Sequence, residues 1–337
     1  MSKTLTIDEI AELAGVSKST VSKALNNRRD VSSSTREKIL TIIQEHDFTP
    51  NSLAKSLKSK RTGNIGVIFT REKRPLSNNP FFSRVLEGIE AELALNGCNL
   101  VLKIIKENKV NKLPTMIKEQ QIDGLILMGI FENQFIRGLV TQQIPAVQID
   151  PKANLPEFSQ VFIDNVHGGY LATKYLLDHG HRRIGFVSGD ITRLSFQQRL
   201  TGYKKALASQ NIPVDESLIR TGGFEQGYQH VKYLVENSAP TAIFVANDLN
   251  ALLAYSALHE MGLKIPQDMS VIGFDNIWQT EFCLPPLTTI RVYKEELGSI
   301  GVRMLLNIIN GETDKPITTI VPVRLVERKS VAVYEAK

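Results

Sequence analysis

The chain has 337 residues, which is too long for one ordinary hydrophobic core and indicates two or three domains. With 42% apolar and 22% charged residues and no low-complexity stretch, it has the composition of a soluble globular protein. Four units of the net charge of +5 fall in the first 62 residues, where eleven Lys and Arg face seven Asp and Glu. A polyanionic partner is therefore expected for this basic head alone.

Signals of other protein classes are missing from the sequence. The N-terminus MSKTLTIDEI lacks the basic start and apolar run of a secretory signal, and no apolar run approaches the roughly 18 residues of a membrane span. Cys98 and Cys283 lie far apart and form no CxxC pair. We therefore expect reduced core thiols in a cytoplasmic protein, without a disulfide or a metal site.

Residues 7–26, IDEIAELAGVSKSTVSKALN, predict two short helices separated by a tight turn, with Gly15 as the left-handed residue that ends the first. Ser17 can cap the second helix, which buries Val21 and Ala24. Its outward face carries only hydrogen-bond donors: Lys18, Ser19, Thr20, Ser22 and Lys23. A helix needs such a face to enter a major groove, and the alternative is a helical hairpin with a solvated polar face.

Residues 31–51 predict a third helix that covers the open side of this hairpin. Ser32 to Ser34 offer several possible N-caps, Ser34 with Glu37 would fit a capping box, and Ile39 begins the apolar stripe. Three helices make a core of about 50 residues, which is marginal alone. The next segment, 51–62, is basic and short for an independent helix, so we expect a linker that becomes helical only against a partner. A solvated basic linker is the alternative.

From Gly63 onwards, apolar strands alternate with amphipathic helices. Strands are predicted at 64–69, 99–105, 125–129, 145–150, 183–189, 218–224, 241–247 and 269–275, and two more within 318–331. Helices are predicted at 81–97, 114–121, 168–180, 195–210, 226–237, 249–262 and 298–311. The pattern indicates two α/β lobes with doubly wound parallel sheets, between which the chain crosses repeatedly. Ligands bind beyond the carboxyl ends of such strands, which here carry Thr70, Asp150, Asn247, Asp248 and Asp275.

The common catalytic and phosphate-binding motifs are missing: the sequence has no P-loop, GxSxG, HExxH or strand-associated GxGxxG. His179 and His181 straddle a helix-ending glycine without a third ligand, so a solvated helix end is expected there. The strand-end carboxylates, together with Arg199 and Asn247, suit hydrogen bonding to hydroxyl groups better than proton transfer. We therefore predict no enzyme activity, no catalytic residue, no cofactor and no metal.

The segments TIDEIAELAGVSKSTVSKALN, PNSLAKSLKSKRTGNIGVIF, DNVHGGYLATKYLLDHGHRRIGFVSG, VANDLNALLA, VIGFDN, PPLTTI and LVERKSV cover much of the chain. Together they resemble the lactose/galactose repressor (LacI/GalR) family of bacterial transcription regulators. The resemblance implies a helix-turn-helix headpiece in residues 1–50, a hinge helix in 51–62 and a body in 63–337 like periplasmic sugar-binding proteins. We place the N-lobe at about 63–161 plus 291–318 and the C-lobe at about 162–290 plus 319–337.

The resemblance also implies roles for individual residues. DNA bases would be contacted by Lys18, Ser19 and Lys23, with Leu57 wedged into the minor groove. The DNA backbone would be held by Ser17, Thr20, Ser22, Asn26, Ser32 and Thr35. The effector would be bound by Phe81, Asp150, Arg199, Phe224, Asn247 and Asp275, a set that suits a polyhydroxylated sugar.

We therefore expect a cytoplasmic homodimeric repressor of carbohydrate-utilisation genes that binds a double-stranded, pseudo-palindromic operator and responds to a sugar or sugar derivative. No membrane partner is expected, nor the C-terminal heptad helix of tetrameric relatives. Three alternatives stay open: a solute-binding protein of a transporter, a regulator that responds to a nucleobase, and one that responds to a protein co-regulator. The basic loop 71–79 also leaves room for a charged or phosphorylated ligand.

Overall fold

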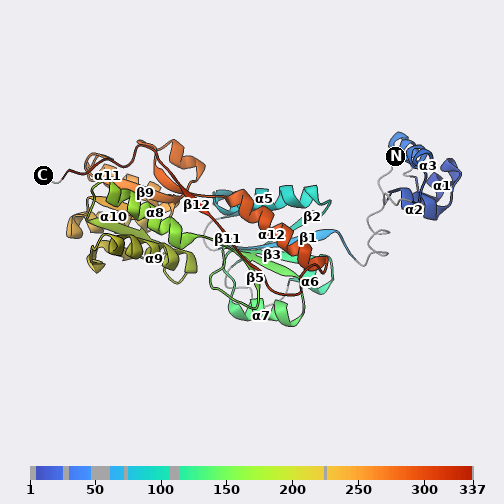
Figure 1. The fold of residues 1–337 in the computed structure, drawn as a ribbon, viewed down its shortest axis with the longest axis horizontal. Coiled ribbons are helices and arrows are strands. Elements are labelled where there is room, and N and C mark those ends of the chain that lie inside the picture. Colours follow the sequence, from blue (N-terminus) through green and yellow to red (C-terminus); the bar gives the residue numbers. More distant parts are fainter. Residues whose placement is uncertain are drawn as a thin grey trace. The chain divides into compact units, whose positions relative to one another are not determined.

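The computed structural model describes residues 5–25, 30–46, 61–71, 75–106, 114–223 and 226–335 (Figure 1). The chain divides into two compact units, Met1–Gly63 and Asn64–Lys337. Three predicted site residues, Asn26, Leu57 and Phe224, lie outside the described residues, as does most of the predicted hinge segment 51–62. Among the described helices, none is long and apolar enough to cross a membrane.

The described residues of the first unit form three helices: α1 (Ile7–Ala14), α2 (Lys18–Leu25) and α3 (Ser33–Glu45). A capping box between Thr6 and Glu9 starts α1, and Gly15 ends it with a φ of 67°, as predicted. The predicted Ser34–Glu37 capping box is wrong, because the Ser32 side chain caps α3 instead by accepting from the Thr35 N–H at 3.2 Å. The helices share one small core: Ile10, Ala11, Ala14, Val21, Ala24, Val31 and Ile39.

The second unit has two lobes, each built on a six-stranded sheet (Figure 1). The sheet of the first lobe has the order β11-β5-β4-β3-β1-β2, with every neighbouring pair parallel. Its strands are β1 (Asn64–Arg71), β2 (Asn99–Lys106), β3 (Gly124–Met128), β4 (Ala146–Ile149), β5 (Ser159–Ile163) and β11 (Thr318–Val321). Its helices are α5 (Phe82–Leu95), α6 (Thr115–Lys118), α7 (Asn133–Thr141) and α12 (Lys294–Ile309), with a 3-10 turn η1 at Leu76–Asn78.

The sheet of the second lobe has the order β12-β10-β9-β8-β6-β7, in which only the β10–β12 pair is antiparallel. Its strands are β6 (Ile184–Ser188), β7 (Ile219–Thr221), β8 (Ala242–Val245), β9 (Ser270–Asp275), β10 (Thr288–Val292) and β12 (Val323–Val326). Its helices are α8 (Asn165–Asp178), α9 (Leu194–Ser209), α10 (Gly227–Ser238) and α11 (Asp248–Glu260), with 3-10 turns η3 (Glu216–Leu218) and η4 (Trp278–Glu281). The central strands β6, β8 and β9 are buried along their whole length, and the predicted pair of doubly wound lobes is confirmed.

The chain passes between the lobes three times, after β5, β10 and β11. The lobe boundaries expected at 161, 290 and 318 each lie inside one of these strands, and the crossings come a few residues later. The apolar pattern of a strand does not mark the point where the chain leaves a lobe. Two elements of the first lobe, α7 and β5, were not predicted at all, because both are short and have no distinctive flanking signal.

Candidate functional site

Helix α2 turns a face of donors towards the solvent. Lys18, Ser19 and Lys23 are exposed, whereas Val21 and Ala24 on the opposite side are buried in the headpiece core. The outward placement predicted for the three base-contacting residues is therefore what the structure has. A carboxylate accompanies each lysine: Asp8 pairs with Lys18, and Asp30 lies 2.7 Å from Lys23 Nζ. Such exposed pairs contribute little stability, so a polyanion can compete for both ammonium groups.

Two helix starts in the headpiece carry pairs of hydroxyl groups. Ser17 Oγ lies 2.9 Å from Thr20 Oγ1 and accepts the Thr20 N–H at the start of α2. Ser32 Oγ lies 2.7 Å from Thr35 Oγ1 at the start of α3. A helix N-terminus combines unpaired N–H groups with the positive end of the dipole, which suits a phosphate. These four residues are therefore placed well for the backbone contacts predicted for them, as is Ser22 on α2.

In the second unit, glycines allow α8 and α9 to pack closely and so set the position of Arg199. A Cβ on Gly169 would lie 2.3 Å from the Arg199 carbonyl oxygen, and one on Gly202 would lie 2.2 Å from the Val166 carbonyl oxygen. Arg199 is consequently 4% exposed and points along the sheet end towards β9. The close contact of these two helices holds a cation beside the carboxyl ends of β8 and β9.

The buried guanidinium of Arg199 has a partner on each side. Its Nε donates to Asn165 Oδ1 at 2.9 Å, and Nη1 donates to the carbonyl oxygen of Ala246 at the end of β8. Nη2 lies 3.3 Å from Asp275 Oδ1, and the guanidinium carbon lies 3.7 Å from the centre of the Phe274 ring. The planar fork of arginine can satisfy these directions together, which a lysine cannot do.

Asp275 and Asp150 are acceptors with spare capacity. Asp275, with a φ of 111°, is buried, and its Oδ1 accepts no hydrogen bond from any described residue, although the Arg199 charge is near. Burial raises the pKa of Asp275 in spite of Arg199 and Lys294. Burial also raises the pKa of Asp150 to about 6; the Arg199 charge opposes this rise and Asp275 adds to it. Two desolvated carboxyl groups facing one guanidinium form a site for groups that donate hydrogen bonds.

The third strand-end carboxylate, Asp248, has a structural role. It is completely buried and accepts hydrogen bonds from the Ile277 N–H at 2.9 Å and from Thr289 Oγ1 at 2.7 Å. Burial and the nearby Asp275 charge raise the pKa of Asp248 to about 7. These bonds hold the turn that follows β9 against β10, so Asp248 supports Asp275 instead of facing a ligand.

The other predicted effector residues are less closely tied to this cluster. Asn247 caps α11 by accepting the Asn250 N–H at 3.0 Å, which uses part of its side chain for structure. Phe81 immediately precedes α5 in the first lobe, with its ring 5.1 Å from that of Phe82. Among the described residues, the structure thus brings Asp150, Arg199 and Asp275 together, whereas the Phe81 ring packs against Phe82.

Two charged residues at this site were not predicted. Arg193 precedes α9, and burial together with the Arg199 charge lowers the pKa of Arg193 to about 10. Its place in the loop between β6 and α9, six residues before Arg199, is a signal that could have identified it. Lys294 is the first residue of α12, yet its ammonium reaches the carbonyl oxygens of Asp275 and Asn276. Nothing in the local sequence distinguishes this lysine from a solvated one.

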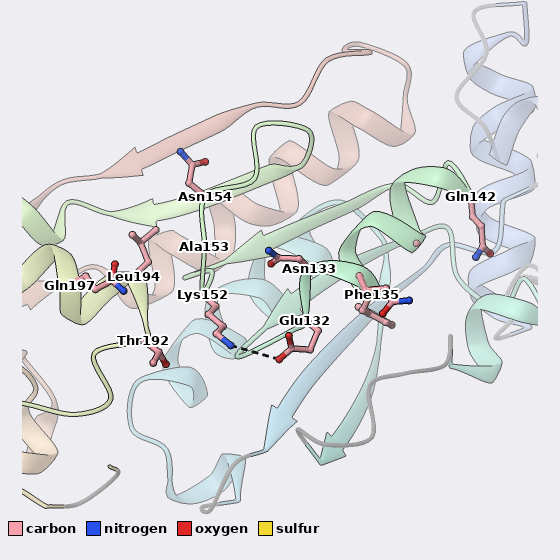
Figure 2. Close-up of a pocket in the computed structure, with 12 residues that line it drawn as sticks. Glu132, Asn133, Phe135, Gln142, Lys152, Ala153, Asn154, Thr192, Leu194 and Gln197 are labelled. Carbon is pink, nitrogen blue, oxygen red and sulfur yellow. Dashed lines mark ion pairs between the residues drawn. The ribbon is translucent and has the colours of Figure 1, made fainter. Parts of the chain in front are cut away.

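A groove of about 850 Å³ opens at the boundary of the two lobes (Figure 2). In it Lys152 points towards Glu132, with Nζ and Oε1 3.7 Å apart, and the Leu194 N–H donates to the Lys152 carbonyl oxygen at 3.2 Å across the lobes. Its wall contains many amide groups: Asn133, Gln134, Gln142, Asn154 and Gln197. None of the predicted effector residues that the structure describes lines this groove, whereas Lys152 and Leu194 both do.

The two histidines of the DHGH segment do not form a metal site. The prediction of a solvated helix end is wrong for His181, which is buried and lies 3.0 Å from Thr241 Oγ1 and 3.2 Å from the Ala332 carbonyl oxygen. Its role is to attach the C-terminal segment to β8. Across the described part of the chain, no group of three His, Cys, Asp or Glu side chains is placed to hold a metal ion.

Two family profiles match the chain. The profile described as "Bacterial regulatory proteins, lacI family" matches residues 6–51, which contain all three headpiece helices. The profile described as "Periplasmic binding protein-like domain" matches residues 173–331, most of the second lobe together with α12 and β11.

Individual proteins match over nearly the whole length. The HTH-type transcriptional repressor PurR of Pasteurella multocida is 35% identical over 333 residues, 97% of this chain and 98% of that protein. A structure of the Lac repressor dimer bound to operator and the anti-inducer ONPF superposes with a TM-score of 0.80 at 29% identity, covering 98% of this chain and 100% of that one. The complex of the transcriptional regulator CelR with cellobiose gives a TM-score of 0.75 at 29% identity, covering 97% and 99%.

Proposed function

The chain belongs to the lacI family of bacterial regulatory proteins, and we propose that it controls genes of carbohydrate use through a sugar bound between its two lobes. It is a DNA-binding transcriptional repressor with an effector-binding domain, and not an enzyme.

The proposal assigns base recognition to the exposed face of α2. Lys18, Ser19 and Lys23 stand clear of the headpiece core, and a lysine that donates to guanine in the major groove contributes about 1–3 kcal/mol of discrimination. The hydroxyl pairs at the starts of α2 and α3 would hold the phosphates on either side. Asn26 and Leu57 keep the backbone and minor-groove roles that the resemblance implies.

The observation that supports a sugar is the pair of carboxyl groups beside Arg199. Asp150 makes no hydrogen bond or ion pair with a described side chain, and Asp275 Oδ1 is ion-paired with Arg199 Nη2 at 3.3 Å but accepts no hydrogen bond, so both carboxyl groups keep acceptor capacity for a ligand's donors. The hydroxyl groups of a sugar supply several donors without adding negative charge. An anionic ligand would place its charge against two carboxylates. CelR, whose structure contains cellobiose, shows that a protein of similar fold takes such a ligand.

We also propose that two copies associate through the second lobe. Trp278, Phe282 and Leu284 are 65%, 72% and 88% exposed, and the Trp278 and Phe282 rings lie 5.7 Å apart. Large apolar side chains exposed this close together in the chain suggest a covered surface, and the similar Lac repressor structure is a dimer. A dimer would place two headpieces on a pseudo-palindromic operator. Leu284→Glu should then sediment as a monomer, whereas unchanged dimerisation would exclude this face.

A two-part experiment tests the proposal. Electrophoretic mobility shift with the full-length protein should retard a fragment upstream of a sugar-utilisation gene at low salt, and the double variant Lys18→Ala/Lys23→Ala should not. A thermal-shift screen of neutral sugars, sugar phosphates and purine nucleobases should give the largest rise in melting temperature with a neutral sugar. That sugar should change the mobility shift, and its direction distinguishes an inducer from a co-repressor.

A nucleobase is the second candidate, because the repressor with 35% identity is the purine repressor PurR. Stabilisation by a purine nucleobase and by no sugar would replace the proposed effector and leave the repressor assignment intact. Stabilisation by no small molecule would favour a protein co-regulator.

A further inference from the structure

Lys294 joins the two lobes through a buried ammonium group. Its backbone begins α12, which packs in the first lobe, but its Nζ donates to the carbonyl oxygens of Asp275 at 2.6 Å, Asn276 at 3.2 Å and Val292 at 3.3 Å. All three acceptors belong to the second lobe, and Lys294 is 6% exposed. An ammonium group has three N–H donors and no acceptor, so three carbonyl oxygens satisfy it completely.

The turn that Lys294 holds has a backbone that side-chain-bearing residues rarely adopt. Asp275 has a φ of 111° and Asn276 a φ of 50°. The turn is fixed from its other side by the Ile277 N–H on Asp248 and by Arg328 Nη2, which donates to Asn276 Oδ1 at 2.9 Å. Lys294 therefore supplies the part of this support that comes from outside the second lobe.

On the first-lobe side, Lys294 is attached to a rigid pair of helices. A Cβ on Gly88 of α5 would lie 2.0 Å from the Glu295 carbonyl oxygen, and one on Gly298 of α12 would lie 2.3 Å from the Val85 carbonyl oxygen. Ser299 Oγ adds a hydrogen bond of 3.2 Å to the Gly88 carbonyl oxygen. The two helices lie side by side in Figure 1, and their close contact leaves little freedom for one to move without the other.

We propose that Lys294 is the pivot of the lobes: the second lobe turns about its ammonium group, which at the same time holds Asp275 in the orientation that a ligand meets. Because the acceptors surround Nζ while the backbone of Lys294 moves with α12, the lobes can change their angle through the lysine stem without breaking these bonds. The orientation of Asp275 towards a ligand rests on the function proposed above, whereas the pivot does not.

The pivot role is expected for Lys294 and not for other cations on α12. Lys294→Met keeps the length of the stem and removes the ammonium group, and Lys294→Arg keeps donors at its end. Arg303→Met is the matched control, since Arg303 on α12 pairs at 2.8 Å with Glu92 of α5 and so stays within the first lobe. All three are made in the full-length protein.

Hydrogen exchange tests whether Lys294 stabilises the turn at Asp275 and Asn276. In Lys294→Met the amides of Asn276 and Ile277 should exchange at least about tenfold faster, while the β8 peptide keeps its protection. Lys294→Arg should restore most of that protection, and Arg303→Met should match the wild type. Equal exchange at Asn276 and Ile277 in the wild type and in Lys294→Met, with the fold intact, would overturn the proposal.

Electron paramagnetic resonance tests the pivot. Spin labels are attached through Glu119→Cys in the first lobe and Glu236→Cys in the second, both exposed positions, with Cys98→Ser and Cys283→Ser as background. The labelled protein is diluted with unlabelled protein, so that a labelled chain rarely pairs with another labelled chain and the measured distances between labels are those within one chain. Lys294→Met should widen the distribution of distances between the two labels about twofold. Lys294→Arg and Arg303→Met should keep the width measured in the labelled protein without these substitutions.

If the distance distribution in Lys294→Met is as narrow as in the labelled protein without this substitution, the pivot is refuted. If that variant does not fold, Lys294→Gln, which keeps a shorter donor, should give the same two changes to a smaller degree. Neither measurement uses DNA or a ligand, so failure of the pivot can be told apart from failure of the proposed function.

Discussion

Replacing Asp150 by asparagine should stabilise the ligand-free protein at neutral pH while removing its response to ligand. Asp150 directly follows β4 and has a φ of 50°, a conformation that asparagine adopts at least as readily, so the backbone adds no cost. The substitution keeps the shape of the side chain and removes only the carboxylate that the fold has desolvated. Ligand affinity and stability are therefore expected to move in opposite directions at this residue.

The size of the expected stabilisation follows from the pKa of Asp150. Burial raises it from 3.8 to about 6, and each unit corresponds to about 1.4 kcal/mol, which gives about 3 kcal/mol if no water screens the group. Because Asp150 is only half-buried, we reduce this to about 1–2 kcal/mol. The folded state binds the proton more tightly than the unfolded state, so stability is lost as the pH rises from about 4 to about 6, and the loss is complete above that range.

Differential scanning calorimetry of the full-length protein between pH 4.5 and 8 checks this prediction. Asp150→Asn should melt about 2–4 °C above the wild type at pH 7–8, and the difference should shrink towards pH 4.5. Asp314→Asn, at an exposed position, is the control and should follow the wild type at every pH. If the variant melts below the wild type at pH 7, Asp150 is not a desolvated acceptor. The same follows if the difference in melting temperature between the two proteins is equal at all pH values.

Substitutions at four further residues probe the headpiece, the hinge segment, the cluster around Arg199 and the helix pair α5–α12. Arg199→Ala should abolish the effect of the stabilising sugar on the mobility shift yet keep operator binding, and Arg199→Lys should not restore it; induction retained in either variant would remove Arg199 from the site. Ile39→Ala should cost the headpiece about 3 kcal/mol and eliminate operator binding, with calorimetry showing the melting of residues 64–337 unchanged; a normal mobility shift would contradict the small shared core. Gly298→Ala should lower the melting temperature of the second unit through a clash worth about 2–3 kcal/mol with Val85, and an unchanged temperature would mean that α5 and α12 are not tightly packed. Leu57→Ala should weaken binding to the operator in a mobility shift while salt-sensitive binding to random DNA is kept, and equal losses would argue against a minor-groove wedge.

The headpiece was largely predictable because its signals are local. Gly15 at the end of α1 and the donor face of α2 follow from the spacing of residues within one or two helical turns. The choice of cap for α3 was not predictable in the same way, since Ser32, Ser33 and Ser34 offer the same hydroxyl chemistry. Only the backbone path into the helix selects Ser32 among them.

For the body, the alternation of buried strands and amphipathic helices predicted two parallel-sheet lobes, and the carboxyl ends of the strands indicated Asp150 and Asp275. The sequence could not distinguish a ligand-facing carboxylate from a structural one. Asp248 and Asp275 both come at the ends of apolar strands. Asp248 accepts hydrogen bonds from the Ile277 N–H and Thr289 Oγ1, while Asp275 Oδ1 faces Arg199 in an ion pair and accepts no hydrogen bond. That difference depends on neighbours 29 and 41 residues away.

The sequence by itself determined the class of the protein: a basic three-helix head with a donor face, followed by two α/β lobes without catalytic motifs. These properties depend on residue type and short-range periodicity, which a linear chain displays directly. The tertiary structure alone decided where the chain crosses between lobes, which charges are desolvated and which lysine is buried. Lys294 shows the reason, because its acceptors Asp275 and Asn276 come next to it only when two sheets and two helices have packed. The burial and the hydrogen-bond partners of a side chain depend on the residues that pack around it. Packing brings together residues whose positions in the sequence do not indicate that they will be neighbours.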